Sequence, residues 1–149
     1  ENPSYAKDAL VRELERLLEA QVILIPSLKS DMTGHADGMV RFVDENTVIG
    51  NRVPAKNGLE QRIRAVLSEH GIDTVDFPYY SSPKGSAAGC YLNFLETTSH
   101  ILLTAFGHPM DREAVREATR LFPKAIVPVD IHEIAKEGGG LHCISWEST

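Results

Sequence analysis

The feature that most restricts the possible folds of this chain is a repeated order of helical and strand patterns. Each round contains an amphipathic helix, a short apolar strand and two further strands joined by a turn. The repeat is roughly fifty to sixty residues long, a length typical of modular architectures. The sequence therefore predicts an α/β fold of repeated modules, with no internal domain boundary in residues 1–149.

The bounds of the predicted elements come from the spacing of apolar residues and from turn residues. Pro3 and Ser4 suit the start of the first helix, and Gly71 suits the end of the second. Helices are expected at 6–20, 55–71, 110–122 and 130–137, and strands at 22–26, the far end of 35–43, 47–51, 74–77, 90–96, 100–106, 125–129 and 141–146.

Composition and charge exclude several classes of partner. The net charge is −6, from 21 acidic and 15 basic residues, which argues against nucleic acid as a ligand. No apolar run is long enough to span a membrane, and the first residues lack the layout of a signal peptide. The two cysteines, Cys90 and Cys143, form no disulfide framework, so we expect a reducing compartment, the cytoplasm.

A histidine and a carboxylate, His35 and Asp37, stand two residues apart at the start of a predicted strand. Residues i and i+2 of an extended backbone point to the same side, so both side chains would face one pocket. A proton-transfer group beside a carboxylate suits general acid–base chemistry. The alternative is a loop histidine close to a surface carboxylate.

Cys143 follows three consecutive glycines, Gly138 to Gly140, close to the end of the chain. Its thiol is either a nucleophile or a small buried apolar group. On a strand, His142 would point to the opposite face and lie buried and hydrogen-bonded, which leaves His35 as the candidate partner of the thiol. No CxxC or HxxxH spacing is present, and no phosphate-binding loop surrounds the glycines, so neither a metal nor a cofactor is expected.

Asn93 interrupts the apolar segment CYLNFLE. A polar side chain on a buried strand must either find hydrogen bonds within the protein or line a site. Both interpretations are open from the sequence.

Taken in order, four segments resemble the agmatine deiminase and Porphyromonas-type peptidyl-arginine deiminase family of guanidine-modifying enzymes. They are ENPSYAKDALVRELERLL, DMTGHADGMVRFVDENTVIGN, CYLNFLE with FGHPMDREA, and GGGLHCIS. The resemblance implies a pentein fold, a propeller-like ring of five α/β modules. The chain matches the C-terminal catalytic portion of that family, about two to three modules, and thus an incomplete part of the ring.

The same resemblance implies hydrolysis of a guanidinium group, in agmatine or peptidyl-arginine, to a ureido product and ammonia. Cys143 would be the nucleophile that forms a thiouronium intermediate, and His35 the proton donor and then the base. Asp37 would bind the guanidinium, Asn93 would help to shape the substrate site, and Gly139 and Gly140 would let the backbone approach the substrate.

The chain departs from the family pattern in one respect. The family's WxxRD-type and EGG-type segments belong to its N-terminal part and are not found here. The resemblance therefore implies that the chain alone does not turn over agmatine. Open module edges, formed by strands 22–26 and 125–129 and by the helix face with Leu10, Leu14 and Leu17, predict self-association.

Two other functions are compatible with the sequence. One is a pentein-like module that keeps the His, Asp and Cys side chains but has no activity. The other is a thiol amidohydrolase of a different class, which would act on amides without a preference for cationic amidines.

Overall fold

The computed structural model describes residues 6–27, 34–53 and 58–146. Pro3, Ser4 and residues 31–33 of the DMTGHADG segment lie outside the described residues. The elements are α1 (Lys7–Leu18), η1 (Ala36–Gly38), β1 (Val40–Asp44), β2 (Thr47–Asn51), α2 (Gly58–Glu69), β3 (Asp73–Phe77), β4 (Leu95–Glu96), β5 (His100–Ala105), α3 (Asp111–Leu121), β6 (Ala125–Asp130) and α4 (His132–Ala135). Within these residues, no helix has the length and apolar character needed to cross a membrane.

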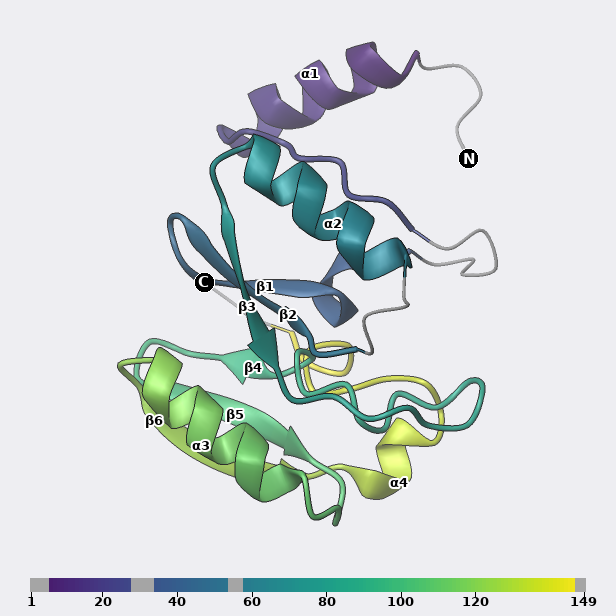
Figure 1. Ribbon diagram of the computed structural model, residues 1–149, viewed down its shortest axis with the longest axis vertical. Helices are drawn as coiled ribbons and strands as arrows, with labels where there is room; N and C mark the ends of the chain where they lie inside the picture. Colours follow the sequence, from purple (N-terminus) through teal and green to yellow (C-terminus); the bar gives the residue numbers. More distant parts are fainter. Residues whose placement is uncertain (1–5, 28–33, 54–57, 147–149) are drawn as a thin grey trace.

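The described strands form two three-stranded sheets of the same topology, ordered β1-β2-β3 and β4-β5-β6. In each sheet the first two strands are antiparallel, and a helix then leads to a third strand parallel to the second. Figure 1 shows the two sheets one above the other, with α2 against the first and α3 against the second. From β1 to β6 the described elements therefore follow the repeated α/β order predicted from the sequence.

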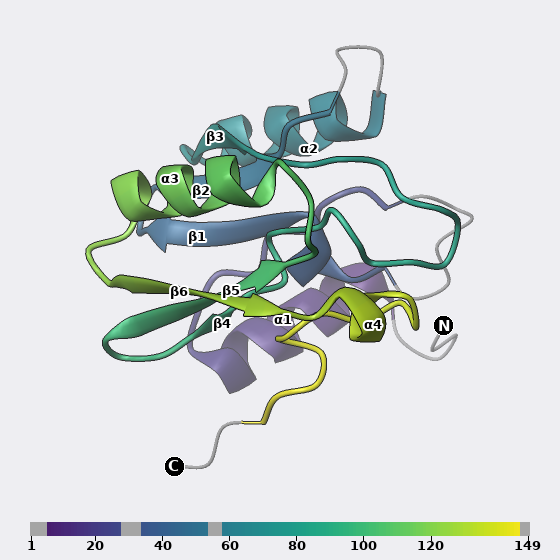
Figure 2. The same cartoon turned by 90° about the horizontal axis from the view of Figure 1, so that it is seen from below.

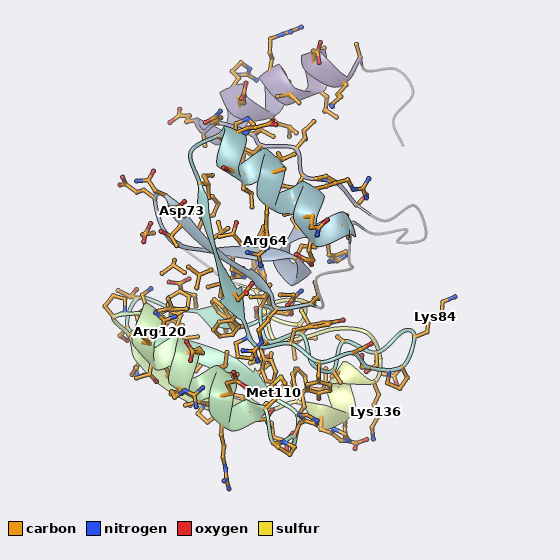
Figure 3. All side chains as sticks on the ribbon, in the orientation of Figure 1. Arg64, Asp73, Lys84, Met110, Arg120 and Lys136 are labelled. Atoms are coloured by element: carbon orange, nitrogen blue, oxygen red, sulfur yellow. The ribbon has the colours of Figure 1, made fainter. Side chains whose placement is uncertain are left out.

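One continuous core joins the two ββαβ units, which are β1-β2-α2-β3 and β4-β5-α3-β6. Ile49 and Phe77 of the first unit pack in the same buried cluster as Tyr91, Phe94 and Leu103. A second cluster lies under α2, where Ile63 and Leu67 pack with Val48 of β2. Figure 3 shows Arg64 reaching from α2 toward β3, where its guanidinium pairs with Asp76. The glycine predicted to end α2, Gly71, has a φ of +74°, as a helix-terminating glycine requires.

The apolar segment 22–26 is not a strand, although its composition predicts one. Ile23 and Ile25 still pack against the cluster under α2, but Leu24 is 45% exposed. A strand needs a neighbour for its backbone hydrogen bonds, and none of the described strands pairs with this segment. The preceding helix, α1, has no buried residue, and its Leu10 and Leu17 side chains are exposed. Figure 1 shows α1 at one end of the molecule, away from the second sheet, and Figure 2, seen from below, shows it as the faint, more distant helix behind that sheet.

Two further strand predictions are wrong. Of residues 90–96, only Leu95–Glu96 form a strand, and Cys90 contributes one isolated bridge to Tyr79. Residues 141–144, expected within a strand at 141–146, form turns instead. The two segments lie against each other through hydrogen bonds of Asn93 with His142 and Cys143, rather than through the backbone pairing of a sheet.

Candidate active site

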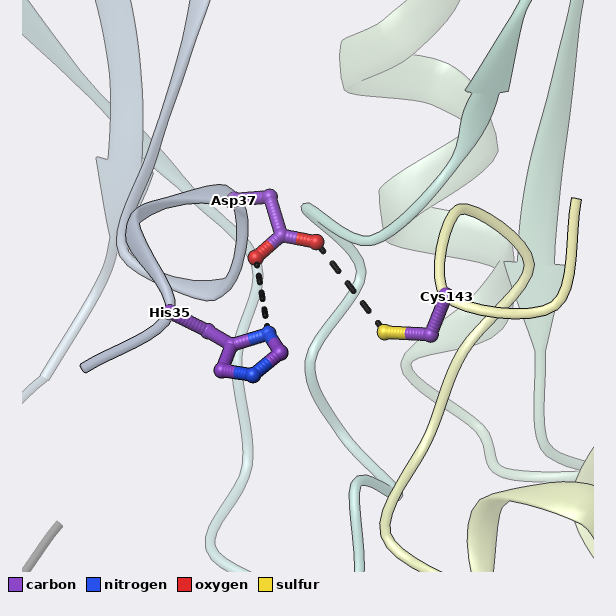
Figure 4. Close-up of side chains that lie close together, drawn as sticks. All are labelled: His35, Asp37 and Cys143. Atoms are coloured by element: carbon purple, nitrogen blue, oxygen red, sulfur yellow. Dashed lines mark hydrogen bonds and ion pairs between the residues drawn. The ribbon is translucent and has the colours of Figure 1, made fainter. Parts of the chain in front are cut away.

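Three side chains from opposite ends of the chain meet where η1 of the first unit faces the turn after α4. Figure 4 shows His35, Asp37 and Cys143 pointing toward one another. His35 Nδ1 lies 3.5 Å from Asp37 Oδ1, and the Cys143 thiol lies 4.0 Å from Asp37 Oδ2. One potential ligand atom from each residue lies within 4.8 Å of the others. The fold therefore brings together the proton-transfer group, the carboxylate and the thiol proposed from the sequence.

The route by which His35 and Asp37 meet differs from the prediction. They do not share one side of an extended strand, because residues 36–38 form the 3₁₀ helix η1 with His35 at its N-cap position. This turn is fixed to the first sheet, since Asn51 at the end of β2 donates its side-chain N–H to the Gly38 carbonyl at 2.8 Å. Asn51 was not predicted from the sequence as a neighbour of this turn. Its position as a polar residue at the end of an apolar strand was the available signal.

Asn93 connects the carboxylate to the thiol segment. Its side-chain N–H donates to Asp37 Oδ2 at 2.7 Å, and its carbonyl oxygen accepts from the Cys143 backbone N–H at 3.3 Å and from the thiol at 3.4 Å. Asn93 is only 5% exposed, so these contacts satisfy a buried amide. The first interpretation of Asn93 is therefore confirmed, since its amide is hydrogen-bonded within the protein to Asp37 and Cys143; a role in shaping a substrate site stays a prediction.

Close packing explains two of the three glycines before Cys143, Gly138 and Gly140. Gly138 has a φ of +90°, and a Cβ built on it would lie 2.9 Å from the Gly85 carbonyl oxygen. A Cβ on Gly140 would lie 2.8 Å from the Cβ of Asn93, whereas one on Gly139 would lie 3.5 Å from the Cβ of Cys143. Gly140 thus lets the backbone pass directly against the Asn93 side chain. A contact of Gly139 or Gly140 with substrate stays a prediction.

The two thiols have different surroundings. Cys143 is exposed, as is His35, whose side chain is 57% exposed; the side chain of Asp37 is 23% exposed. Burial raises the pKa of the Cys90 thiol to about 11, so Cys90 stays protonated at neutral pH. Its thiol donates to the Gly38 carbonyl at 3.5 Å and so supports η1. Reactivity toward solutes therefore falls to Cys143.

The prediction of a buried His142 is wrong. Residues 141–144 form turns, and His142 is exposed. Its backbone N–H donates to the backbone carbonyl of Asn93 at 3.3 Å. A side-chain hydrogen bond between Tyr91 and Asp111 was also not predicted from the sequence: the Tyr91 hydroxyl donates to the Asp111 carboxylate at 2.6 Å. This bond joins the segment that precedes Asn93 to the start of α3.

The chain is similar in sequence to curated proteins named agmatine deiminase. The chain is 38% identical to an agmatine deiminase of Stutzerimonas stutzeri over 76 residues, which are 50% of this chain and 21% of that protein. It is 37% identical to an agmatine deiminase of Pseudomonas aeruginosa over the same shares of the two chains. These alignments thus span about a fifth of the length of the curated relatives.

The fold is similar to that of solved agmatine deiminases. The structure from Enterococcus faecalis matches with a TM-score of 0.82 and 20% identity over 97% of this chain and 49% of that one. The structure from C. jejuni matches with a TM-score of 0.76 and 21% identity over 95% and 46%. The chain therefore spans about half the length of each solved relative, with the same mixed α/β fold. The family profile described as Porphyromonas-type peptidyl-arginine deiminase matches residues 1–148, and the chain belongs to that family.

Proposed function

We propose that this chain is the catalytic portion of a deiminase that hydrolyses a guanidinium group to a ureido group and ammonia. The observation that carries the proposal is the meeting of His35, Asp37 and Cys143 within 4.8 Å, although Cys143 follows Asp37 by 106 residues. The relatives named agmatine deiminase support guanidine hydrolysis as the reaction class. Agmatine or a peptidyl-arginine is the proposed substrate.

The first proposed step is attack of the Cys143 thiolate on the guanidinium carbon. The new C–S bond forms as one C–N bond breaks, and His35 gives a proton to the leaving nitrogen, which departs as ammonia. Asp37 accepts hydrogen bonds from guanidinium N–H groups, and its charge compensates the cation. The product of this step is a thiouronium held on Cys143.

The second proposed step releases the product. His35, now neutral, takes a proton from a water molecule, whose oxygen attacks the thiouronium carbon. The C–S bond then breaks, the second proton of the attacking water passes to solvent, the neutral ureido product leaves, and the thiolate is restored. The pairing of His35 Nδ1 with Asp37 supports this role, because a carboxylate on one ring nitrogen orients the imidazole and leaves Nε2 for proton transfer.

The proposed reaction needs more of the protein than this chain. We infer that the two ββαβ units belong to a pentein ring, and that the N-terminal half of such a ring supplies a second carboxylate to the guanidinium. The extent of the matches, about half of each solved relative, supports this inference. On this account the chain alone binds amidines weakly and does not turn them over.

A haloacetamidine tests the proposal without requiring turnover, since it carries a cationic amidine beside an electrophilic carbon. We expect 2-chloroacetamidine to alkylate Cys143, located by peptide mapping and mass spectrometry. Cys143→Ser should abolish the adduct, and the matched Cys90→Ser should leave it intact because Cys90 is partly buried and its raised pKa keeps the thiol protonated. Equal labelling of the two cysteines, or none on Cys143 in the folded chain, would refute the proposed nucleophile.

A further inference from the structure

The cluster of His35, Asp37 and Cys143 has the composition of a metal site as well as that of a catalytic one. An imidazole, a carboxylate and a thiolate are the three ligand types that Zn²⁺ binds in proteins. Spacing motifs could not reveal this set, because the three ligands come from η1, its N-cap and a turn near the far end of the chain. The cluster depends on the fold rather than on local sequence.

The distances suit a tetrahedral ion after a small closure of the site. Zinc bonds of about 2.0–2.3 Å at tetrahedral angles place neighbouring ligand atoms roughly 3.3–3.7 Å apart. His35 Nδ1 lies 3.5 Å from Asp37 Oδ1, and Cys143 Sγ lies 4.0 Å from the other carboxylate oxygen, Oδ2. With one ligand atom taken from each residue, all three atoms lie within 4.8 Å of one another. His35 and Cys143 are exposed, so their side chains have room to close on an ion.

An outer layer of hydrogen bonds already orients two of the three ligands. Asn93 donates to Asp37 Oδ2 and accepts from the backbone N–H of Cys143. Metal sites commonly hold their ligands through such secondary contacts, whose loss lowers affinity by about 10–100-fold. The buried amide of Asn93 thus prepares the carboxylate and the thiol for a shared ligand.

We propose that His35, Asp37 and Cys143 bind one zinc-class divalent cation, with a fourth position open to water. The thiol proton passes to the buffer as the metal–sulfur bond forms. Thiolate and imidazole favour Zn²⁺ or Co²⁺ over Mg²⁺ and Ca²⁺, which prefer oxygen ligands. The bound ion covers the thiol and the carboxylate, and so blocks the place that the proposed function gives to a guanidinium. Binding itself does not depend on deiminase activity.

Cobalt(II) is the direct probe, because a cobalt–thiolate bond gives a near-ultraviolet charge-transfer band and a four-coordinate ion gives strong visible bands. We expect both in the reduced 149-residue chain, saturating at one cobalt per chain, and loss of both when Zn²⁺ is added. Cys143→Ser should remove the charge-transfer band. His35→Ala and Asp37→Ala should each weaken binding at least about tenfold, because the loss of a secondary contact alone costs about 10–100-fold.

Two control variants separate this site from adventitious binding. His142→Ala and Cys90→Ser remove a neighbouring imidazole and the other thiol, and both should bind cobalt as the unmodified chain does. Zinc should also protect Cys143 from iodoacetamide, and a chelator should restore alkylation. Absence of the charge-transfer band in a chain folded by circular dichroism, or its persistence in Cys143→Ser, would overturn the proposal. Failure of amidine labelling alone would count against the proposed deiminase and not against the metal site.

Discussion

Replacement of Gly140 by alanine tests whether the Asn93 bridge holds the site together. The new Cβ would lie 2.8 Å from the Cβ and the Cγ of Asn93, and ordinary carbon contacts begin at 3.4 Å. Asn93 or the backbone must therefore move by about 0.6 Å, and a shift of Asn93 away from Asp37 by that amount would stretch the 2.7 Å bond past the usual limit of about 3.2 Å. Overpacking of this kind costs about 1–3 kcal/mol.

Gly139→Ala is the matched control, because its Cβ would make only an ordinary 3.5 Å contact with the Cβ of Cys143. We expect urea unfolding to place Gly140→Ala about 1–3 kcal/mol below the unmodified chain and Gly139→Ala within about 0.5 kcal/mol of it. Gly140→Ala should also slow alkylation of Cys143 by 2-chloroacetamidine. A Gly140→Ala chain as stable and as reactive as Gly139→Ala would refute the packing argument.

Three other predictions concern the rest of the chain. Tyr91→Phe removes the 2.6 Å bond to Asp111 and should lower the unfolding free energy by about 1.5–3 kcal/mol in urea titrations; an unchanged midpoint would contradict this. Burial raises the pKa of the Glu60 carboxyl above its ordinary 4.5, so the folded state holds this proton more tightly, and stability is lost as pH rises through the raised value. Glu60→Gln should therefore stabilise the chain at neutral pH but not below pH 4.5, and equal effects at both would refute the assignment. Exposed Leu17 and Phe42 predict self-association in light scattering, and the chain alone should release no ammonia from agmatine; a dilute, active monomer would contradict both expectations.

The helices α2 and α3 and the paired strands were predictable because their apolar spacing reflects a face that is buried in this chain, whereas α1 shows the same spacing although none of its residues is buried. The helix expected at 110–122 is α3, whose Ala114 and Ala118 are buried, and the hairpin of β1 and β2 follows the expected turn. Segments 22–26 and 90–94 are equally apolar but lack a neighbouring strand among the described residues. Hydrophobicity alone predicts burial, whereas a strand also needs a partner for its backbone.

The candidate site was predictable by residue type and not by local geometry. His35, Asp37, Asn93 and Cys143 were named from motifs, and the structure brings all four into contact. The 3₁₀ turn at η1 and the turn at 141–144 depend on tertiary hydrogen bonds, such as the one from Asn51 to Gly38. Short-range patterns cannot encode such bonds, because their partners lie far away in sequence.

The central claim is that Cys143 reacts beside a carboxylate that recognises a cationic amidine. Its most direct test compares the rates at which 2-chloroacetamidine and neutral 2-chloroacetamide alkylate Cys143. The ratio of the two rates is divided by the same ratio for free cysteine, which gives a normalised preference for the cation. This preference is measured in the unmodified chain and in Asp37→Asn. A charge-assisted hydrogen bond is worth about 1.5–3 kcal/mol, and partial exposure of Asp37 favours the lower end, so the normalised preference should be about tenfold. Asp37→Asn should abolish this preference while Cys143 still reacts with the amide. No normalised preference in the unmodified chain, or an equal preference in Asp37→Asn, would contradict the account and favour a thiol amidohydrolase or an inactive module.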